Sequence, residues 1–94
     1  MTNITLFKDT INESTYNLDD DLVLVDYDEQ DGDILATFDL SGITLEYIST
    51  SEGLTLDSAY VLDGGYNFFD INTFNTTVLN AKVEDIILDY IMGF

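Results

Sequence analysis

The chain of 94 residues contains nineteen Asp and Glu against two Lys and no Arg, which gives a formal charge of −17. It also lacks His, Cys, Trp and Pro. His is the usual general base near neutral pH and Cys the usual thiolate nucleophile, so we expect no enzyme and no cofactor. Two Lys cannot hold a nucleic-acid backbone, which excludes direct binding of DNA or RNA.

Hydrophobic residues make up 46% of the chain, enough for a packed core, and the length predicts a single domain over residues 1–94. No stretch approaches the roughly 18–20 apolar residues of a membrane span. The segment Met1–Tyr16 lacks the basic region and apolar run of a signal peptide. We therefore expect a cytoplasmic protein that does not bind membranes.

The first segment, Met1–Phe7, fits either a short strand or the lead-in to a helix over about residues 6–16.

The following segment has a clearer pattern. Leu22–Asp28 and Asp33–Leu40 alternate as strands around Asp31-Gly32. This pair is typical of tight hairpins because both turn residues need positive φ. Pairing across this turn places three apolar pairs on one face: Tyr27 with Ala36, Val25 with Phe38, and Val23 with Leu40.

A second tight turn at Ser41-Gly42 leads to a strand over Ile43–Ser49. Pairing across it extends the same apolar face with Leu40 opposite Ile43, Phe38 opposite Leu45, and Ala36 opposite Tyr47. Because two independent turns agree on the register, we predict a three-stranded meander. Its other face would carry Asp26, Asp39 and Glu46, together with the apolar side chains of Leu24, Leu35 and Ile48.

The segment from Ser51 to Asn75 is less regular. Thr55–Leu62 and Tyr66–Phe69 are candidates for a fourth and a fifth strand, separated by a turn at Gly64-Gly65. Five aromatic residues fall here: Tyr60, Tyr66, Phe68, Phe69 and Phe74. Aromatic side chains anchor both cores and interfaces, and we expect most of these in the core and Tyr66 on the surface.

Helical spacing of apolar residues predicts an amphipathic helix over about Thr77–Met92, with Thr76 or Thr77 as its N-cap. The residues that show this spacing are Leu79, Val83, Ile86, Ile87, Tyr90 and Ile91. The helix would cover the apolar face of the meander. We therefore expect an α+β fold, an antiparallel meander of three to five strands with a C-terminal amphipathic helix packed on one face.

Carboxylates close together in sequence raise the question of metals and catalysis. Asp26, Asp28, Asp31 and Asp33 are spaced like calcium ligands, but an EF-hand has Asn or Asp where Gln30 stands, Gly in place of Asp31, and Glu at its twelfth position. A pair of carboxylates resembles a glycosidase centre, yet so short a domain seldom builds a substrate cleft. We expect no metal site and no catalytic residues.

The acidic residues are instead candidates for binding a basic partner. The proposed partner-binding residues are Asp19, Asp20, Asp21, Asp26, Asp28, Glu29, Asp31, Asp33, Asp39, Glu46 and Tyr66. Alternate strand positions are about 6.6–6.8 Å apart, which is comparable to the spacing of phosphates along a nucleic-acid strand. The alternatives are a merely solvated acidic surface and adaptation to high salt.

A dense acidic tract, Asp19–Asp39, on a short chain without Arg resembles the DNA-mimic inhibitors of bacteriophages, a class that includes anti-restriction proteins, anti-CRISPR proteins and inhibitors of uracil-DNA glycosylase. The likeness is one of character, because the glycosylase inhibitors carry Glu-Ser-Ile where Glu13-Ser14 is followed here by Thr15, and they end in a strand. The resemblance implies a stoichiometric inhibitor that occupies the nucleic-acid site of a defence or DNA-processing enzyme.

The leading hypothesis is thus a phage-encoded nucleic-acid mimic, monomeric when free, that inhibits a basic nucleic-acid-binding protein in the bacterial cytoplasm. Two alternatives stay open. An immunity protein for a nuclease toxin would depend on an aromatic hot spot at Tyr66 or Phe68. A small virion or assembly component would self-associate, which the one-signed charge opposes.

Overall fold

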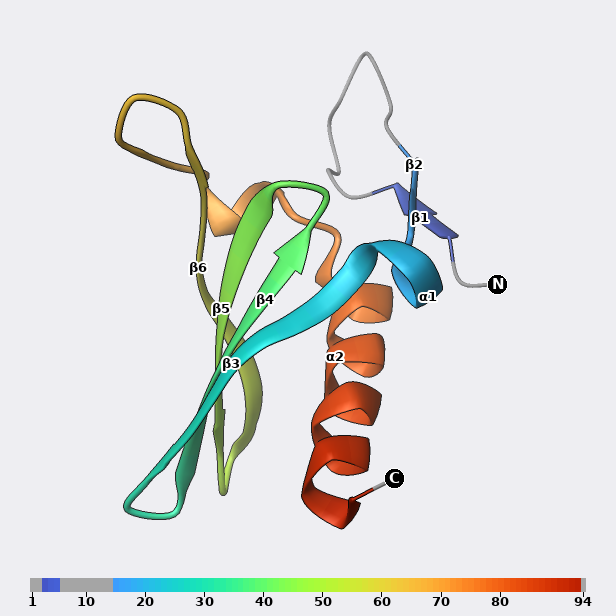
Figure 1. Ribbon diagram of the computed structural model, residues 1–94, viewed down its shortest axis with the longest axis vertical. Coiled ribbons are helices and arrows are strands. Elements are labelled where there is room, and N and C mark those ends of the chain that lie inside the picture. Colours follow the sequence, from blue (N-terminus) through green and yellow to red (C-terminus); the bar gives the residue numbers. More distant parts are fainter. Residues whose placement is uncertain (1–2, 6–14, 94) are drawn as a thin grey trace.

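An antiparallel sheet of five strands and one long helix form the two layers of the computed structural model, which describes residues 3–5 and 15–93 (Figure 1). The strands follow the order of the chain across the sheet: β3 (Leu22–Gln30), β4 (Asp33–Leu40), β5 (Ile43–Thr50), β6 (Gly53–Leu62) and β7 (Tyr66–Phe68). Helix α2 (Thr76–Met92) lies along one face. The predicted α+β fold is confirmed.

Smaller elements flank these layers. β1 (Asn3–Thr5) pairs with β2 (Thr15–Asn17), which runs into the four-residue helix α1 (Leu18–Asp21). A short 3-10 turn, η1 (Ile71–Thr73), precedes α2. The first segment is therefore a strand at Asn3–Thr5, while most of the alternative helix over 6–16, Lys8 and the Glu13-Ser14 pair lie outside the described residues.

Both tight turns of the meander have the backbone that their sequences predict. Asp31 and Gly32 have φ of 53° and 87°, and Ser41 and Gly42 have φ of 50° and 91°. Positive φ at both central residues matches the right-handed twist of the flanking strands, and Gly adopts it without the steric cost of a Cβ. The β4–β5 register is as predicted, with Phe38 opposite Leu45.

The β3–β4 register is as predicted only near the turn. Tyr27 pairs with Ala36, but the register shifts between Leu24 and Asp26 because β3 contains an extra residue, Val25. The predicted pairs of Val25 with Phe38 and Val23 with Leu40 are therefore wrong; the residues opposite Phe38 and Leu40 are Leu24 and Leu22. This β-bulge leaves Val25 63% exposed and brings Leu24 onto the core side.

The core lies between the sheet and α2. Fourteen side chains form it: Leu18, Leu22, Ala36, Phe38, Leu40, Ile43, Leu45, Tyr47, Leu56, Ala59, Phe74, Leu79, Val83 and Ile87. The helix begins one residue earlier than predicted and its N-cap is Asn75, so Thr76 and Thr77 lie inside it. Its burial ends at Ile87, because Tyr90 and Ile91 are 55% and 51% exposed.

A partly buried hydrogen bond joins the two layers. The hydroxyl of Tyr47, on the core face of β5, donates to Asn80 Oδ1 of α2 at 2.7 Å. Burial raises the pKa of Tyr47 above its ordinary value, which favours the protonated hydroxyl that donates this hydrogen bond. The hydrogen bond fixes the helix to the central strand at one point.

Replacing Tyr47 with Phe is expected to lower the free energy of unfolding by about 1 kcal/mol, the usual net value of a single hydrogen bond. Asn80 is half-buried and can recruit water, which limits the loss. Urea denaturation would measure it. The matched control is Tyr66→Phe, because the Tyr66 side chain is 67% exposed, and its expected change is close to zero. A loss of zero for Tyr47→Phe would contradict a stabilising contact here.

Candidate functional site

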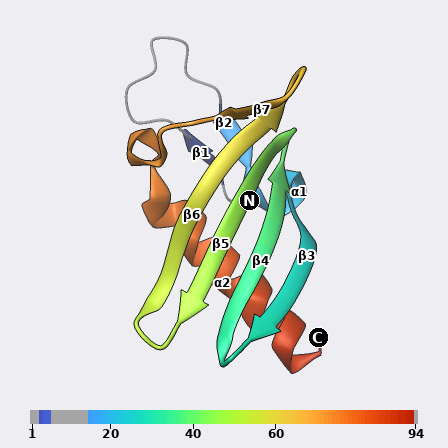
Figure 2. The ribbon, with the colours of Figure 1, turned by 90° about the vertical axis from the view of Figure 1, so that its left-hand side faces the viewer.

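The face of the sheet opposite α2 is the candidate site, and we call it the outer face. Alternate residues of β3 to β6 point away from the core onto it. In the part of the chain that the structure describes, no helix or strand lies over this face (Figure 2). Its side chains are therefore available to a partner.

Direct pairing arranges the outer face in rows that cross the strands. One row contains Val23, Asp39, Thr44, Tyr60 and Phe68. The next contains Asp26, Thr37, Glu46 and Ser58. A third contains Asp28, Leu35, Ile48 and Thr55. Adjacent rows are about 6.6–6.8 Å apart along a strand, so Asp26 and Asp28 of β3 have a spacing close to that of neighbouring phosphates.

A shallow hollow of about 190 Å³ lies in the middle of the outer face. Leu35 and Ile48 contribute apolar surface to it, and the carboxylates of Glu46 and Asp57 lie at its margin. Glu46 is held in place by Ser58, whose Oγ donates to its Oε1 at 2.5 Å. The hollow thus combines an apolar centre with negative charge.

Asp57 was missed by the sequence reasoning because its position depends on a second β-bulge. The β5–β6 register shifts between Glu46 and Tyr47, so that Asp57 is an extra residue between Leu56 and Ser58. A bulge has no reliable sequence signal when no Gly marks it. Conversely, Leu24 was predicted on the acidic face, and the bulge in β3 moves it to the core side.

Three aromatic rings cluster at one corner of the outer face, and we call Tyr60, Tyr66 and Phe68 the aromatic corner. The centroid of Tyr60 lies 5.2 Å from those of Tyr66 and Phe68, and these two stack at 6.3 Å with an interplanar angle of 24°. Tyr66 and Phe68 are 67% and 65% exposed. The exposure expected for Tyr66 is confirmed.

The expectation that most of the aromatic residues of this segment lie in the core is wrong. Phe74 is buried, and Phe69 packs against the core with its ring 5.9 Å from that of Phe74. Phe68, in contrast, faces solvent because it pairs directly with Tyr60 of β6 and so shares its face. Strand alternation decides between neighbours: Phe68 and Phe69 point to opposite sides.

The predicted acidic residues do not form one surface. Asp26, Asp28, Asp39 and Glu46 lie on the outer face, and Asp33 continues it toward the hairpin end. Asp31 is in the turn itself. Asp26 has a second role, because its Oδ1 accepts the Tyr27 backbone N–H at 3.0 Å and so caps a donor on this edge strand.

Glu29 lies on the opposite side of the sheet, because it shares the strand face of Tyr27 and Ile34. The Tyr27 hydroxyl donates to Glu29 Oε1 at 2.8 Å. Burial, followed by this hydrogen bond and the charge of Glu29, raises the pKa of Tyr27. Tyr27 also contacts Tyr90 of α2, with ring centroids 4.3 Å apart. The Glu29 carboxylate is therefore separated from the rows of the outer face.

Asp19, Asp20 and Asp21 form most of α1 and take part in its own hydrogen bonds. Asn17 Oδ1 accepts the Asp19 N–H at 3.0 Å, and the Asn17 side chain and backbone donate to Asp20 and Asp21. Lys82 Nζ of α2 lies 2.9 Å from Asp19 Oδ1. These three residues thus belong to a short helix that Asn17 caps, on the α2 side of the sheet.

The outer face carries a single sign of charge. Among residues 15–93 the only Lys or Arg is Lys82, and it is paired with Asp19 on the α2 side. No described cation therefore neutralises Asp26, Asp28, Asp39 or Glu46. Within the described residues, no group of three or more carboxylates is close enough to hold a metal ion. The face can therefore attract a basic surface.

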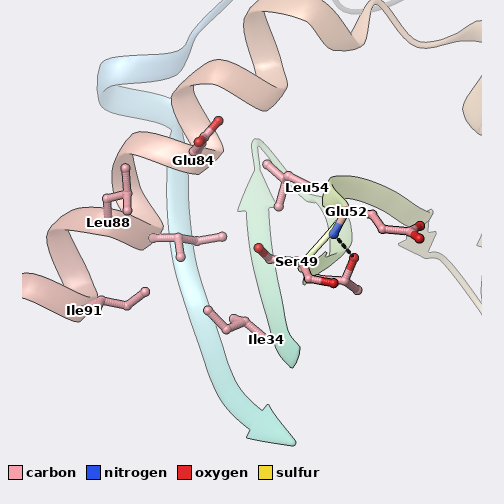
Figure 3. A pocket seen from close by; sticks show the side chains of 11 residues that line it. Ile34, Ser49, Glu52, Leu54, Glu84, Leu88 and Ile91 are labelled. Atoms are coloured by element: carbon pink, nitrogen blue, oxygen red, sulfur yellow. Dashed lines mark hydrogen bonds between the residues drawn. The ribbon is translucent and has the colours of Figure 1, made fainter. Parts of the chain in front are cut away.

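A separate groove of about 300 Å³ lies on the other side of the molecule, between the C-terminal half of α2 and the ends of β4 to β6 (Figure 3). Ile34, Leu54, Leu88 and Ile91 provide its aliphatic lining, and Glu84 lies at its margin. Its polar lining consists of the hydroxyl side chains of Ser49, Thr50 and Ser51 and the carboxylate of Glu52.

Comparison with models of protein families, with curated proteins and with solved structures finds no match. Among the described helices, none is long and apolar enough to cross a bilayer. The geometry of the outer face is therefore the basis for proposing a function.

Proposed function

We propose that this protein is a nucleic-acid mimic, whose outer face occupies the nucleic-acid site of a basic protein and blocks it by stoichiometric binding rather than catalysis. The observation that carries the proposal is the charge of this face. It presents Asp26, Asp28, Asp39, Glu46 and Asp57 without a described Lys or Arg among them. A groove that is lined by Lys and Arg would meet a surface similar to its own ligand.

Two features of the geometry support this proposal. Asp26 and Asp28 lie in adjacent rows of β3, about 6.6–6.8 Å apart along the strand, which is close to the phosphate repeat. The hollow between them offers Leu35 and Ile48 as an apolar centre with a charged surround, which is the usual anatomy of a protein interface. Complementary potentials would accelerate association and make it sensitive to salt.

The proposed setting follows from the resemblance to small phage inhibitors. The protein would be a phage-encoded inhibitor of a bacterial defence system, of the anti-CRISPR or anti-restriction kind, and act in the host cytoplasm. A formal charge of −17 would keep free copies apart, so the protein would be monomeric until it meets its target.

The test is an affinity pull-down from a bacterial lysate at low salt, with elution by a salt gradient and identification by mass spectrometry. We expect one or a few nucleic-acid enzymes, released at moderate salt and displaced by duplex DNA. A partner that is released neither by salt nor by duplex DNA would contradict mimicry. Its binding to this protein would then depend neither on charge nor on the nucleic-acid site.

The aromatic corner favours a second candidate, an immunity protein that caps a nuclease toxin. Tyr66 and Phe68 are exposed in a way that suits an interface hot spot. In that case Tyr66→Ala or Phe68→Ala would weaken binding more than any single Asp substitution, and one cognate nuclease would be recovered instead of several DNA-binding proteins.

A further inference from the structure

The aromatic corner is an apolar surface that no described element covers. Tyr66 and Phe68 expose about two thirds of their side chains, and Leu62, which pairs with Tyr66, is 65% exposed. Neighbouring exposed aromatic side chains of this kind usually mark a binding surface in a soluble protein. The question is which chemical group fits the corner.

The charge around the aromatic corner indicates which chemical group would bind there. Glu46 of β5 lies in the row next to that of Tyr60 on the adjacent strand β6, and burial, followed by the negative charge of Glu46, raises the pKa of Tyr60. Asp39 and Tyr60 belong to the same row, separated by Thr44. No described Lys or Arg lies on the outer face. An occupant that combines a flat apolar surface with positive charge is therefore complementary.

We propose that the aromatic corner binds an arginine side chain of the protein partner, with the guanidinium against the rings of Tyr66 and Phe68 and its N–H groups directed toward Glu46. The guanidinium is planar and weakly hydrated, so it stacks on aromatic faces and still donates hydrogen bonds in its own plane. Lysine ammonium is compact and strongly hydrated, and gains less from the rings. This inference rests on the proposed function and specifies the partner group that the outer face recognises.

The experiment compares a ten-residue arginine peptide with a ten-residue lysine peptide on the full chain, by isothermal titration calorimetry at low salt. Both probes carry the same charge, so the ratio of their dissociation constants isolates the guanidinium. We expect the native protein to prefer arginine, and Tyr66→Ala with Phe68→Ala to reduce this preference about tenfold. An unchanged ratio in the double variant, or no binding of the arginine peptide, would overturn the inference.

Two control variants test whether the preference for arginine depends on the aromatic rings of the corner. Tyr90→Ala removes another exposed tyrosine that touches a second ring, but on the α2 side, and should leave the ratio unchanged. Phe68→Leu keeps apolar bulk and removes the ring, so it should lower the preference; a preference fully retained in this variant would contradict ring stacking. Circular dichroism verifies that each variant is folded.

The same titration distinguishes failure of this inference from failure of the proposed function. Asp28→Lys with Asp39→Lys should weaken both peptides by similar factors and leave their ratio unchanged. If this charge reversal leaves both dissociation constants unchanged while the aromatic variants remove the preference for arginine, the arginine site is supported. The proposal that the acidic face mimics a nucleic acid is then refuted. If only the charge reversal acts, the acidic face stands and the arginine site is refuted.

Discussion

Replacing both Asp28 and Asp39 with Lys is expected to weaken binding to the captured partner at least about a hundredfold. Close charge pairs across an interface couple by about 1.5 kcal/mol or more, and two such pairs account for a loss of this size. Both residues lie on the outer face, in different rows of the sheet. The measurement is the dissociation constant at several salt concentrations, and we also expect its dependence on salt to decrease.

The matched control reverses two carboxylates away from the outer face. Asp85→Lys with Asp89→Lys changes the formal charge of −17 by the same amount, but on exposed positions of α2. The last turn of a helix, where Asp89 lies, favours cations. An equal loss of binding in both variants would mean that total charge, and not the arrangement on the sheet, drives association.

The order of β3, β4 and β5 in the sheet could be predicted because local turn chemistry fixes it. Asp31-Gly32 and Ser41-Gly42 adopt the positive φ that two-residue turns need, and each turn sets the register of the strands next to it. The helix could be predicted from the spacing of Leu79 and Val83, which are both fully buried. The two turns and the helical spacing each depend on residues that are close together in the sequence.

The two bulges could not be predicted, because they depend on packing between strands. Residues 22–25 are all apolar, so nothing in the sequence indicates that Leu24 rather than Val25 packs against the core. At Asp57 the same kind of shift brings an acidic side chain to the hollow of the outer face. Twist and burial of the whole sheet decide where an extra residue is accommodated.

The candidate site could be predicted only in part for a related reason. Acidic residues that are close together in the sequence do not all lie on one surface, since Asp19 is part of α1 and pairs with Lys82, while Glu29 shares the side of Tyr27. Alternation correctly placed Asp39 and Glu46 together. The aromatic corner needed the pairing of β6 with β7, a strand of three residues that is too short for periodicity to define its face.

Phe38→Ala is expected to lower the free energy of unfolding by about 3–5 kcal/mol, the usual cost of removing a buried phenylalanine ring. Phe38 is fully buried, and its ring meets that of Tyr47 edge-on at a centroid distance of 5.9 Å. Domains of this size have total stabilities of about 5–15 kcal/mol, so the variant would be close to unfolding. Urea denaturation at low and high salt measures the free energy of unfolding of the variant. Salt should restore part of this stability by screening the self-repulsion of the chain.

The same assay tests the register of β3, on which the geometry of the outer face depends. Leu24 packs against the core and Val25 is 63% exposed, so Leu24→Ala should cost about 2 kcal/mol or more, and Val25→Ala no more than about 0.5 kcal/mol. Without the bulge the order would be reversed, because Val25 would then face Phe38 from the core side. A larger loss for Val25→Ala than for Leu24→Ala would therefore overturn the shifted register and, with it, the outward position of Val23 beside Asp39.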